Sequence, residues 1–377
     1  MAIVLTEEQI QLRDLVRDFM AGEVKPYISE FDEKGEFPLE IYRKSFELGF
    51  HCLDIPEGNG GIGLDNKTMC VILEEIGKVE PAMAITMLCT SLAMKCVLVG
   101  KNQEQIQRVA DILMPGGFGA FCLTEPDSGS DAASLRTSVV KDGDDYVLNG
   151  SKCFSTNGGY ADVYIVFATL DRKLGAKGIC AFIVEKGTPG LSVGKHENKM
   201  GLRLSNTCDV IFQDVRVPAK NLLGKEGEGF KIAMEGLDEG RAYNGSIAVG
   251  ICQGAVDACV RYAKERRTFG VPIIQHQAVG MMLADMEIYT EAARQLAYNA
   301  MSMADEGKKI TKEAAICKCF CADAAMKVTT DAVQIMGGYG YSKEYPVEKL
   351  MRDAKIFQIF EGTNQIQRLV ILKEMAR

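Results

Sequence analysis

Hydrophobic residues recur with a helical period through the first 117 or so residues. Residues 6–9 have the pattern of a capping box, and Ile10, Leu12, Val16, Phe19 and Met20 follow it at helical spacing. Proline and glycine interrupt this pattern at positions 38, 56–61, 81 and 115–117. The pattern therefore predicts an N-terminal all-α domain over residues 1–117.

From residue 118 to about residue 227 the hydrophobic period shortens to two. Short runs rich in β-branched and aromatic residues, separated by Gly, Asn, Asp and Pro, predict strands at residues 146–150, 163–168, 179–184 and 209–212. This stretch is predicted to form a compact middle β domain over residues 118–227, folded as a β-barrel or a sandwich.

Helical periodicity returns from residue 228 to the end of the chain. Long amphipathic patterns cover residues 230–237, 243–266, 277–305 and 312–336, and they predict a C-terminal four-helix bundle over residues 228–377. The fold class is therefore α+β. A doubly wound dinucleotide fold is not expected, because no G-x-G-x-x-G motif follows a predicted strand.

Charge and cysteine usage narrow the range of functions. A net charge of −8 over 377 residues disfavours a nucleic-acid-binding surface. The 13 cysteines have no framework spacing, which indicates reduced thiols in a cytosol-like compartment. Cys317, Cys319 and Cys321 lie on a predicted helix, where positions two apart point to different faces, so no metal site is expected.

The N-terminus and the longest apolar stretch both argue against a membrane protein. Glu7 and Glu8 leave no charged-then-apolar signal peptide. Residues 82–100 contain Thr86 and Lys95, so a buried core helix is expected there instead of a membrane span. We expect a cytoplasmic protein without membrane insertion.

Glu361 is the only acidic residue in an apolar and amide-rich C-terminal stretch. Desolvation between Phe360 and Gly362 would raise its pKa and make it a competent general base. Gly362 allows close approach of a ligand to the backbone, and Thr363 and Gln365 add neutral hydrogen-bonding groups. The alternative is a loop whose Glu faces water.

Two segments of the predicted β domain could bind a planar heterocycle. In residues 121–131, Thr124, Ser130 and their backbone N–H groups could contact a ring edge or a pyrophosphate. In residues 149–159, Phe154 and Thr156 point to one side of a strand, which suits a ring that stacks and a ring nitrogen that accepts a hydrogen bond. Each segment alone is more often an ordinary turn.

Together with residues 361–363, these segments resemble the acyl-CoA dehydrogenase family. The resemblance runs nearly from end to end. It rests on six motifs in order: L-T-E-P-x-x-G-S-D at 123–131, N-G-x-K-x-[FW]-x-T-N at 149–157, E-R-x-x-F-G at 265–270, Q-I-x-G-G-x-G at 334–340, Y-P-V-E-K-x-x-R-D at 345–353 and E-G-T-x-x-I-Q at 361–367.

The resemblance implies FAD bound between the β domain and the C-terminal bundle. It assigns the FAD of the same subunit to Phe121, Leu123, Thr124, Gly129, Ser130, Phe154, Thr156, Thr363 and Gln365. It assigns the FAD of a neighbouring subunit to Arg266, Phe269, Gln277, Gln334, Gly337 and Gly338. A homo-oligomer, expected to be a tetramer built as a dimer of dimers, follows from this division.

The resemblance also implies the chemistry. Glu361 would remove the α-proton of an acyl-CoA thioester while the β-hydrogen leaves as hydride to the flavin. The implied substrate-binding residues are Ser130, Asp238, Arg241, Phe360 and Gly362. Some members of the family place the base immediately before an Arg that corresponds to Arg241, but that position is Gly240 here, and Glu239 is a minor rival. Asp238 and Arg241 could instead form an i,i+3 salt bridge.

The expected function is oxidation of a short- or medium-chain acyl-CoA to the trans-2-enoyl-CoA, with electrons passed to an electron-transferring flavoprotein. A 2-enoyl-CoA reductase of an anaerobe, acting on short, branched or aryl substrates, would carry the same residues. An acyl-CoA oxidase is the less favoured alternative. Phe360 and Phe357 add bulk near the base and favour a short or flat acyl group.

Overall fold

A computed structural model describes residues 3–377; Met1 and Ala2, with which the predicted N-terminal domain begins, lie outside the described residues. The N-terminal part is helical, as the pattern predicts. It consists of α1 (Glu7–Phe19), α2 (Ile28–Lys34), α3 (Leu39–Glu47), α4 (Asn66–Val79), α5 (Pro81–Gly100) and α6 (Gln103–Leu113). The capping box at Thr6 is present, with hydrogen bonds in both directions between Thr6 and Gln9.

The middle part is an eight-stranded sheet in the order β6-β7-β3-β2-β4-β5-β8, with β1 parallel to β4. The strands are β1 (Gly119–Cys122), β2 (Ser138–Asp142), β3 (Asp145–Thr156), β4 (Val163–Thr169), β5 (Ile179–Glu185), β6 (Leu191–His196), β7 (Thr207–Pro218) and β8 (Leu222–Leu223). β4 is buried on both faces: Ile165 packs in a core with α5, and Val166 packs toward Phe212 of β7. The sheet therefore joins the helical core on one side and has its own core on the other.

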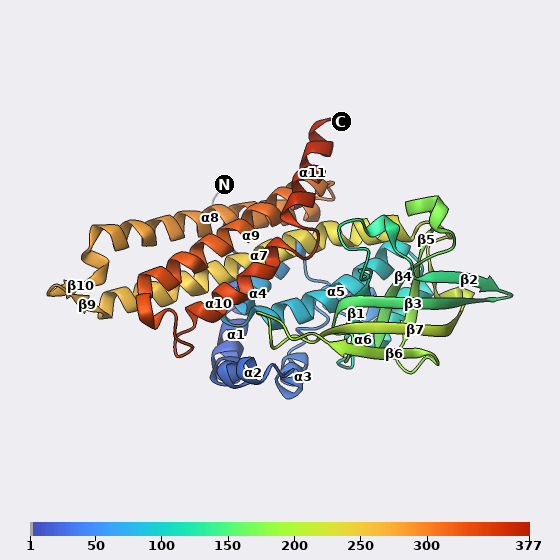
Figure 1. The fold of residues 1–377 in the computed structure, drawn as a ribbon, viewed down its shortest axis with the longest axis horizontal. Helices are drawn as coiled ribbons and strands as arrows, with labels where there is room; N and C mark the ends of the chain where they lie inside the picture. Colours follow the sequence, from blue (N-terminus) through green and yellow to red (C-terminus); the bar gives the residue numbers. More distant parts are fainter. Residues whose placement is uncertain (1–2) are drawn as a thin grey trace.

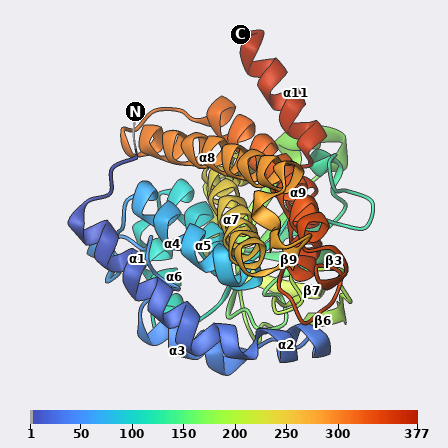
Figure 2. The same ribbon diagram turned by 90° about the vertical axis from the view of Figure 1, so that its left-hand side faces the viewer.

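The C-terminal part consists of α7 (Gly229–Glu265), α8 (Gln277–Asp305), α9 (Thr311–Met336), α10 (Val347–Ala354) and α11 (Asn364–Met375). A short hairpin of β9 (Arg267–Thr268) and β10 (Val271–Pro272) joins α7 to α8. Figure 2 shows α7 enclosed by α4, α5, α8 and α9, and Figure 1 shows α11 projecting from the body. α10 packs on α7 and α9, so the C-terminal part has three long helices, α7, α8 and α9, and two shorter ones, not the four long helices that the pattern predicts.

The two helices predicted over residues 230–237 and 243–266 are one continuous helix, α7, so this part of the prediction was wrong. Glycine within α7 does not end the helix because it serves close packing. A Cβ at Gly250 would lie 2.2 Å from the Glu74 carbonyl oxygen, and one at Gly77 of α4 would lie 2.7 Å from the Ile247 carbonyl oxygen. The loss of helix propensity is offset by the close approach of α4 and α7.

α5 is the one helix within residues 3–377 with the length and composition of a membrane span. Its mean hydropathy over 18 residues is 1.9, but 83% of that window is buried inside the molecule. Its side chains contribute to two hydrophobic cores, one shared with α4 and α7 and one shared with β4 and β5. This packing agrees with the core helix that its polar residues predict.

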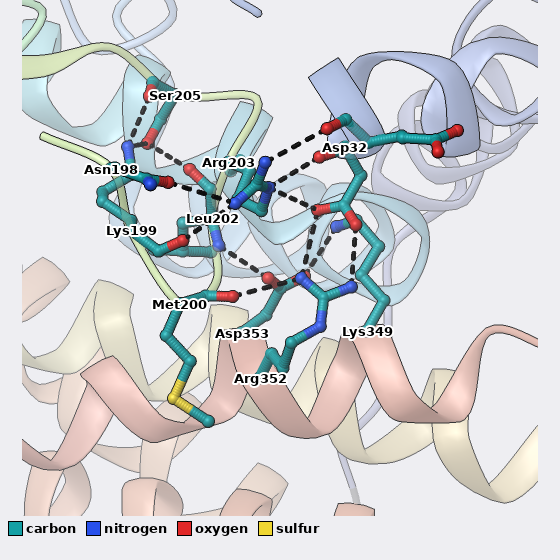
Figure 3. A network of polar contacts seen from close by, with 12 residues as sticks. Asp32, Asn198, Lys199, Met200, Leu202, Arg203, Ser205, Lys349, Arg352 and Asp353 are labelled. Atoms are coloured by element: carbon teal, nitrogen blue, oxygen red, sulfur yellow. Dashed lines mark hydrogen bonds and ion pairs between the residues drawn. The ribbon is translucent and has the colours of Figure 1, made fainter. Parts of the chain in front are cut away.

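A buried ion network joins the three parts of the chain (Figure 3). The Asp353 carboxylate on α10 is fully buried and accepts hydrogen bonds from the Leu202 N–H, between β6 and β7, and from the Lys349 ammonium, both at 2.6 Å. The Lys349 ammonium also lies 2.8 Å from the Glu80 carboxylate, immediately before α5. Since each charge has a partner, the cost of burying these groups is largely offset.

Arg352 extends this network to α2. Its guanidinium binds the carboxylates of Asp32 and Glu348, each at 2.7 Å, and it donates to the Met200 carbonyl at 3.1 Å. Arg203 donates to the Asp32 carbonyl at 2.6 Å from the other side. α10 is thereby fixed against the helical and β domains a few residues before Glu361.

We expect Asp353→Ala to lower the free energy of unfolding by about 3–5 kcal/mol, because it leaves the buried Lys349 ammonium short of a partner. Asp331→Ala is a matched control, since Lys327 and Asp331 form an i,i+4 pair at 2.7 Å in which the Lys side chain is 43% exposed. It should cost about 0.3–0.5 kcal/mol. Chemical denaturation at one protein concentration measures both, and equal losses would contradict the assigned role.

Candidate active site

Glu361 lies in a left-handed turn between the short helix Lys355–Gln358 and α11. Its φ is +56° and that of Gly362 is +85°. The left-handed region is unfavourable for a residue with a Cβ, so neighbouring groups must stabilise this turn. The Gln367 side-chain amide donates to the Glu361 carbonyl at 3.0 Å and to the Gly362 carbonyl at 3.1 Å, and the Lys318 ammonium donates to the Gly362 carbonyl at 2.7 Å.

One oxygen of the Glu361 carboxylate is shielded from solvent, although the residue as a whole is partly exposed. Its Oε2 atom is buried and has no hydrogen-bond partner among residues 3–377. Burial raises the pKa of Glu361 to about 7, although the positive charges of Arg241 and Lys318 oppose this change. This carboxylate therefore exchanges its proton near neutral pH, which suits a general base.

Gly240 of α7 lies opposite this carboxylate. A Cβ at Gly240 would be 3.7 Å from Glu361 Oε2 and 3.9 Å from Leu92 Cδ1. The space beside the carboxylate therefore depends on a residue without a side chain. The rival Glu239 is occupied elsewhere, because Lys95 Nζ of α5 lies 2.6 Å from its Oε2.

Arg241 and Asp238 form the i,i+3 salt bridge that was the alternative to a binding role. Arg241 Nη1 donates to Asp238 Oδ1 at 2.7 Å, and Thr311 Oγ1 donates to Asp238 Oδ2 at 2.6 Å. The buried Arg241 Nε, however, has no partner within the described chain. The salt bridge is therefore present, and it leaves the Arg241 Nε–H available for a further hydrogen bond.

Residues 121–131 and 149–159 are connected by hydrogen bonds and an ion pair whose residues the sequence analysis did not assign to the site. Lys152 is fully buried, and its ammonium donates to Glu125 Oε1 at 2.6 Å and to the Leu123 carbonyl at 3.1 Å. The Glu125 carboxylate also accepts from the backbone N–H of Thr137 at 2.9 Å. The Cys153 N–H donates to the Thr124 carbonyl at 2.9 Å. The edge formed by Leu123 and Thr124 is thereby set against β3.

β3 presents Phe154 to the outside. Its φ is +54°, its side chain is 63% exposed, and the ladder with β7 is irregular between Lys152 and Ser155. Asn157, also left-handed, donates from its amide to the carbonyls of Thr86 of α5, at 2.9 Å, and Gly119 of β1, at 3.0 Å. These bonds fix the end of β3 at Thr156 against α5.

Cys89 of α5 lies between the β segments and Glu361. Its thiol is 3.5 Å from the Thr156 carbonyl oxygen. Burial raises the pKa of Cys89 to about 12, and the Glu361 carboxylate contributes to the same shift. The edge of the β domain and the Glu361 carboxylate therefore face a common region beside α5.

The remaining predicted residues fall into two places. Gly129 and Ser130 are exposed, the Phe121 ring packs at 58° to the Phe167 ring with centroids 5.0 Å apart, and Thr363 caps α11 by accepting from the Ile366 N–H. The second place, at the far end of α7, contains Arg266, Phe269, Gln277, Gln334, Gly337 and Gly338.

A surface cavity lies at this far end of α7. A cavity of about 560 Å³ is lined by Arg266, Gly337, Gly338 and Tyr339 among others, and the Arg266 guanidinium lies 5.6 Å from the Tyr339 ring. Phe269, in the left-handed region, is 96% exposed. Figure 1 shows this hairpin end opposite the sheet. Arg266 follows α7 directly and lies 25 positions after Arg241, which corresponds to about 38 Å along the helix.

Comparisons with known proteins agree with this arrangement. Models of three domains match the chain: "Acyl-CoA dehydrogenase, N-terminal domain" at residues 6–116, "Acyl-CoA dehydrogenase, middle domain" at 120–215 and "Acyl-CoA dehydrogenase, C-terminal domain" at 227–376. An acryloyl-CoA reductase (NADH) of Anaerotignum propionicum is 45% identical over 99% of this chain and 95% of its own.

Two solved structures align with this chain over the full length of both chains. Butyryl-CoA dehydrogenase of Megasphaera elsdenii has a TM-score of 0.98 at 44% identity. A chain solved in a study of the electron transferring flavoprotein of Acidaminococcus fermentans and flavin-based electron bifurcation has a TM-score of 0.97 at 47% identity. The α+β fold is confirmed by these matches.

The matches over the whole chain, together with this fold, define an oxidoreductase that acts on acyl-CoA thioesters. The chain belongs to the acyl-CoA dehydrogenase family, and the resemblance carried by its six motifs is confirmed.

We expect Glu361→Gln to change how stability depends on pH. Because the folded pKa of about 7 exceeds the unfolded value near 4.5, the native state loses stability as pH rises between these values. The substitution removes this loss, so the variant should gain about 2–3 kcal/mol on the wild type between pH 5 and pH 8. Denaturation at both pH values measures it, and an unchanged difference would contradict a raised pKa.

Proposed function

We propose that the protein is an FAD-dependent acyl-CoA dehydrogenase in which Glu361 is the base. The observation that carries this proposal is the Glu361 carboxylate: its Oε2 is buried and has no partner within residues 3–377, and its pKa is raised to about 7. A carboxylate in this state accepts a proton from carbon better than a solvated one does, because its ionised form is not stabilised by water.

The residues present fit FAD. Phe154 is an exposed aromatic on a left-handed backbone, an arrangement that a stacked planar ring would cover, and Thr156 lies on the same side of β3. A Cβ at Gly129, Gly337 or Gly338 would meet nothing within 4 Å, so these backbones are open to a ligand. When bound, FAD supplies the acceptor for the hydride that leaves the β-carbon.

The residues of this chain would carry the proton step. The α-proton of a thioester is weakly acidic, so negative charge that develops on the thioester oxygen must be stabilised as Glu361 takes the proton. Within residues 3–377 no carbonyl or side chain accepts from the Glu361 backbone N–H, which is thus free to donate to that oxygen. Arg241 Nε and Asp238 lie on the adjacent turn of α7 for contacts to the CoA portion.

The contact between α5 and α7 supports a short acyl group. Leu92 and Cys96 of α5 face Gly236 and Gly240 of α7, next to the Glu361 carboxylate. The Lys95–Glu239 ion pair lies one position along each helix from Cys96 and Gly240. A long apolar chain inserted here would desolvate both charges, which is costly, whereas a short chain would end before them.

The electron partner we propose is an electron-transferring flavoprotein. The likeness to the chain studied with the flavoprotein of A. fermentans supports it. The acryloyl-CoA reductase of A. propionicum supports the second direction, reduction of a 2-enoyl-CoA, since the same site serves both directions. An oxidase would be distinguished by rapid reoxidation of its reduced flavin in air.

The 13 buried, unpaired thiols fit a reducing cytoplasm.

We also propose a homo-oligomer, expected to be a tetramer. The predicted FAD contacts at Arg266 and those near Glu361 lie about 38 Å apart along α7. One chain therefore cannot bring both sets to a single site, and a second copy would supply one of them.

Glu361→Gln tests the catalytic role. The amide has the same shape but cannot accept the proton, so flavin bleaching by butyryl-CoA should slow by about 10²–10⁴-fold while FAD content stays unchanged. Stopped-flow absorbance under anaerobic conditions measures this rate. Glu239→Gln is the control, and it should bleach at a rate close to the wild type. A slow Glu239→Gln beside a fast Glu361→Gln would move the base to α7.

Arg266→Ala tests the shared site. Loss of its guanidinium should weaken FAD retention, because a pyrophosphate would lose a charge-assisted partner. If FAD bridges two chains, the oligomer should also dissociate more readily on dilution. Light scattering together with the flavin absorbance of the same fractions measures both. A monomer that retains FAD stoichiometrically on dilution would contradict the homo-oligomer and leave the chemistry at Glu361 standing.

A further inference from the structure

Lys318 of α9 is a buried cation without a salt bridge. It is 1% exposed, and its ammonium donates to two neutral acceptors, the Gly362 carbonyl at 2.7 Å and Asn364 Oδ1 at 3.1 Å. No carboxylate among residues 3–377 lies within 4 Å of it. A buried ammonium without an ion pair carries a large desolvation cost, so its position requires an explanation.

We propose that Lys318 is a positioning residue for the base, which fixes the Glu361–Gly362 turn through the Gly362 carbonyl and whose charge stabilises the ionised carboxylate of Glu361 across the turn. This inference rests on the proposed role of Glu361 as the base.

The first part of the role follows from the turn. Glu361 and Gly362 are both left-handed, and the strain at Glu361 persists only if its surroundings over-determine the backbone. The Gln367 amide and the Lys318 ammonium both donate to the Gly362 carbonyl. Asn364 is the first residue of α11. Its Oδ1 accepts a hydrogen bond from the Lys318 ammonium, and its Nδ2 donates one to the Cys319 carbonyl at 3.1 Å. Lys318 thus ties the turn and the start of α11 to α9.

The second part follows from charge. The largest opposing charge that Lys318 senses is Glu361, and burial nonetheless lowers the pKa of Lys318 to about 8, so it is protonated at neutral pH. The charged and titratable groups near Glu361 come from three elements: the thiols Cys89 and Cys96 and the Lys95–Glu239 pair beside α5, Asp238 and Arg241 of α7, and Lys318 of α9.

Most of these groups are already neutralised. The two thiols stay protonated because burial raises the pKa of each, and Lys95 has Glu239 as its partner. Arg241 shares its charge with Asp238 at 2.7 Å. Lys318 is the cation in this set without a carboxylate in contact. Arg241 has the larger effect on the Glu361 pKa, and Lys318 adds the second opposing charge.

Two substitutions separate the two parts of the role. Lys318→Gln keeps a hydrogen-bond donor and removes the charge, whereas Lys318→Met removes both. In the FAD-loaded protein, the wild-type rate of bleaching by butyryl-CoA should rise with pH through about 7. In both variants the midpoint should move up by about half a pH unit or more, because a stabilising cation is gone. Lys318→Met should also lose about tenfold in the limiting rate, because the base is less well placed.

Lys327→Met is the matched control, since Lys327 is an exposed lysine of the same helix. Its midpoint and limiting rate should equal those of the wild type. An unchanged midpoint in both Lys318 variants would overturn the electrostatic role, even if the limiting rate fell. Unchanged midpoint and limiting rate in both variants would overturn the proposal entirely.

A double-mutant cycle provides a readout that does not depend on activity. The free energy of unfolding of the wild type, Lys318→Gln, Glu361→Gln and the double variant should show coupling at about pH 7.5, where Glu361 is partly ionised, and little coupling at about pH 5. Coupling that is equal at both pH values would overturn the charge interaction. If Glu361→Gln still bleaches rapidly, the proposed function fails, while the cycle still decides whether Lys318 acts on Glu361.

Discussion

The proposed chemistry depends on one carboxylate, that of Glu361, whose Oε2 atom is buried without a hydrogen-bond partner among residues 3–377. Burial raises the pKa of Glu361 to about 7, and Arg241 and Lys318 counteract this effect from a distance. A contacting salt bridge would lower the pKa and weaken the base, whereas burial without any cation would keep the group protonated at neutral pH. A pKa near neutrality lies between these limits, so the pKa of Glu361 depends on the positions of the two cations.

The rest of the fold fixes these positions. α10 is joined to α2, to the start of α5 and to the β6–β7 loop by the network around Asp353, and it leads directly to the Glu361 turn (Figure 3). Asn157 connects the end of β3 to α5, and α5 packs on α7 opposite Glu361. Displacement of any of these elements would alter the solvation of the carboxylate. The position of Glu361 therefore depends on the network around Asp353.

The sequence predicts the fold better than the site. Hydrophobic periodicity identifies the helical and β regions and four of the eight strands of the sheet, but it misses β1, β2, β6 and β8. It also divides α7 wrongly, because the role of glycines such as Gly250 appears only when α4 lies against them. Glu361 stands out as a lone acid in an apolar stretch. Lys152, Asn157 and Lys318 were missed because their partners are distant in the chain. The signal that could have identified Lys318 is a single cation on an otherwise apolar helix face.

The central claim is that Glu361 exchanges a proton with the α-carbon of a bound thioester. The most direct measurement is hydrogen exchange from the α-carbon of phenylacetyl-CoA, which has no β-hydrogen to transfer and so isolates the proton step. In deuterated buffer the FAD-loaded protein should catalyse this exchange with a midpoint near 7, and Glu361→Gln should abolish it. Exchange that persists in Glu361→Gln, or that shows a midpoint near 4.5, would contradict the account.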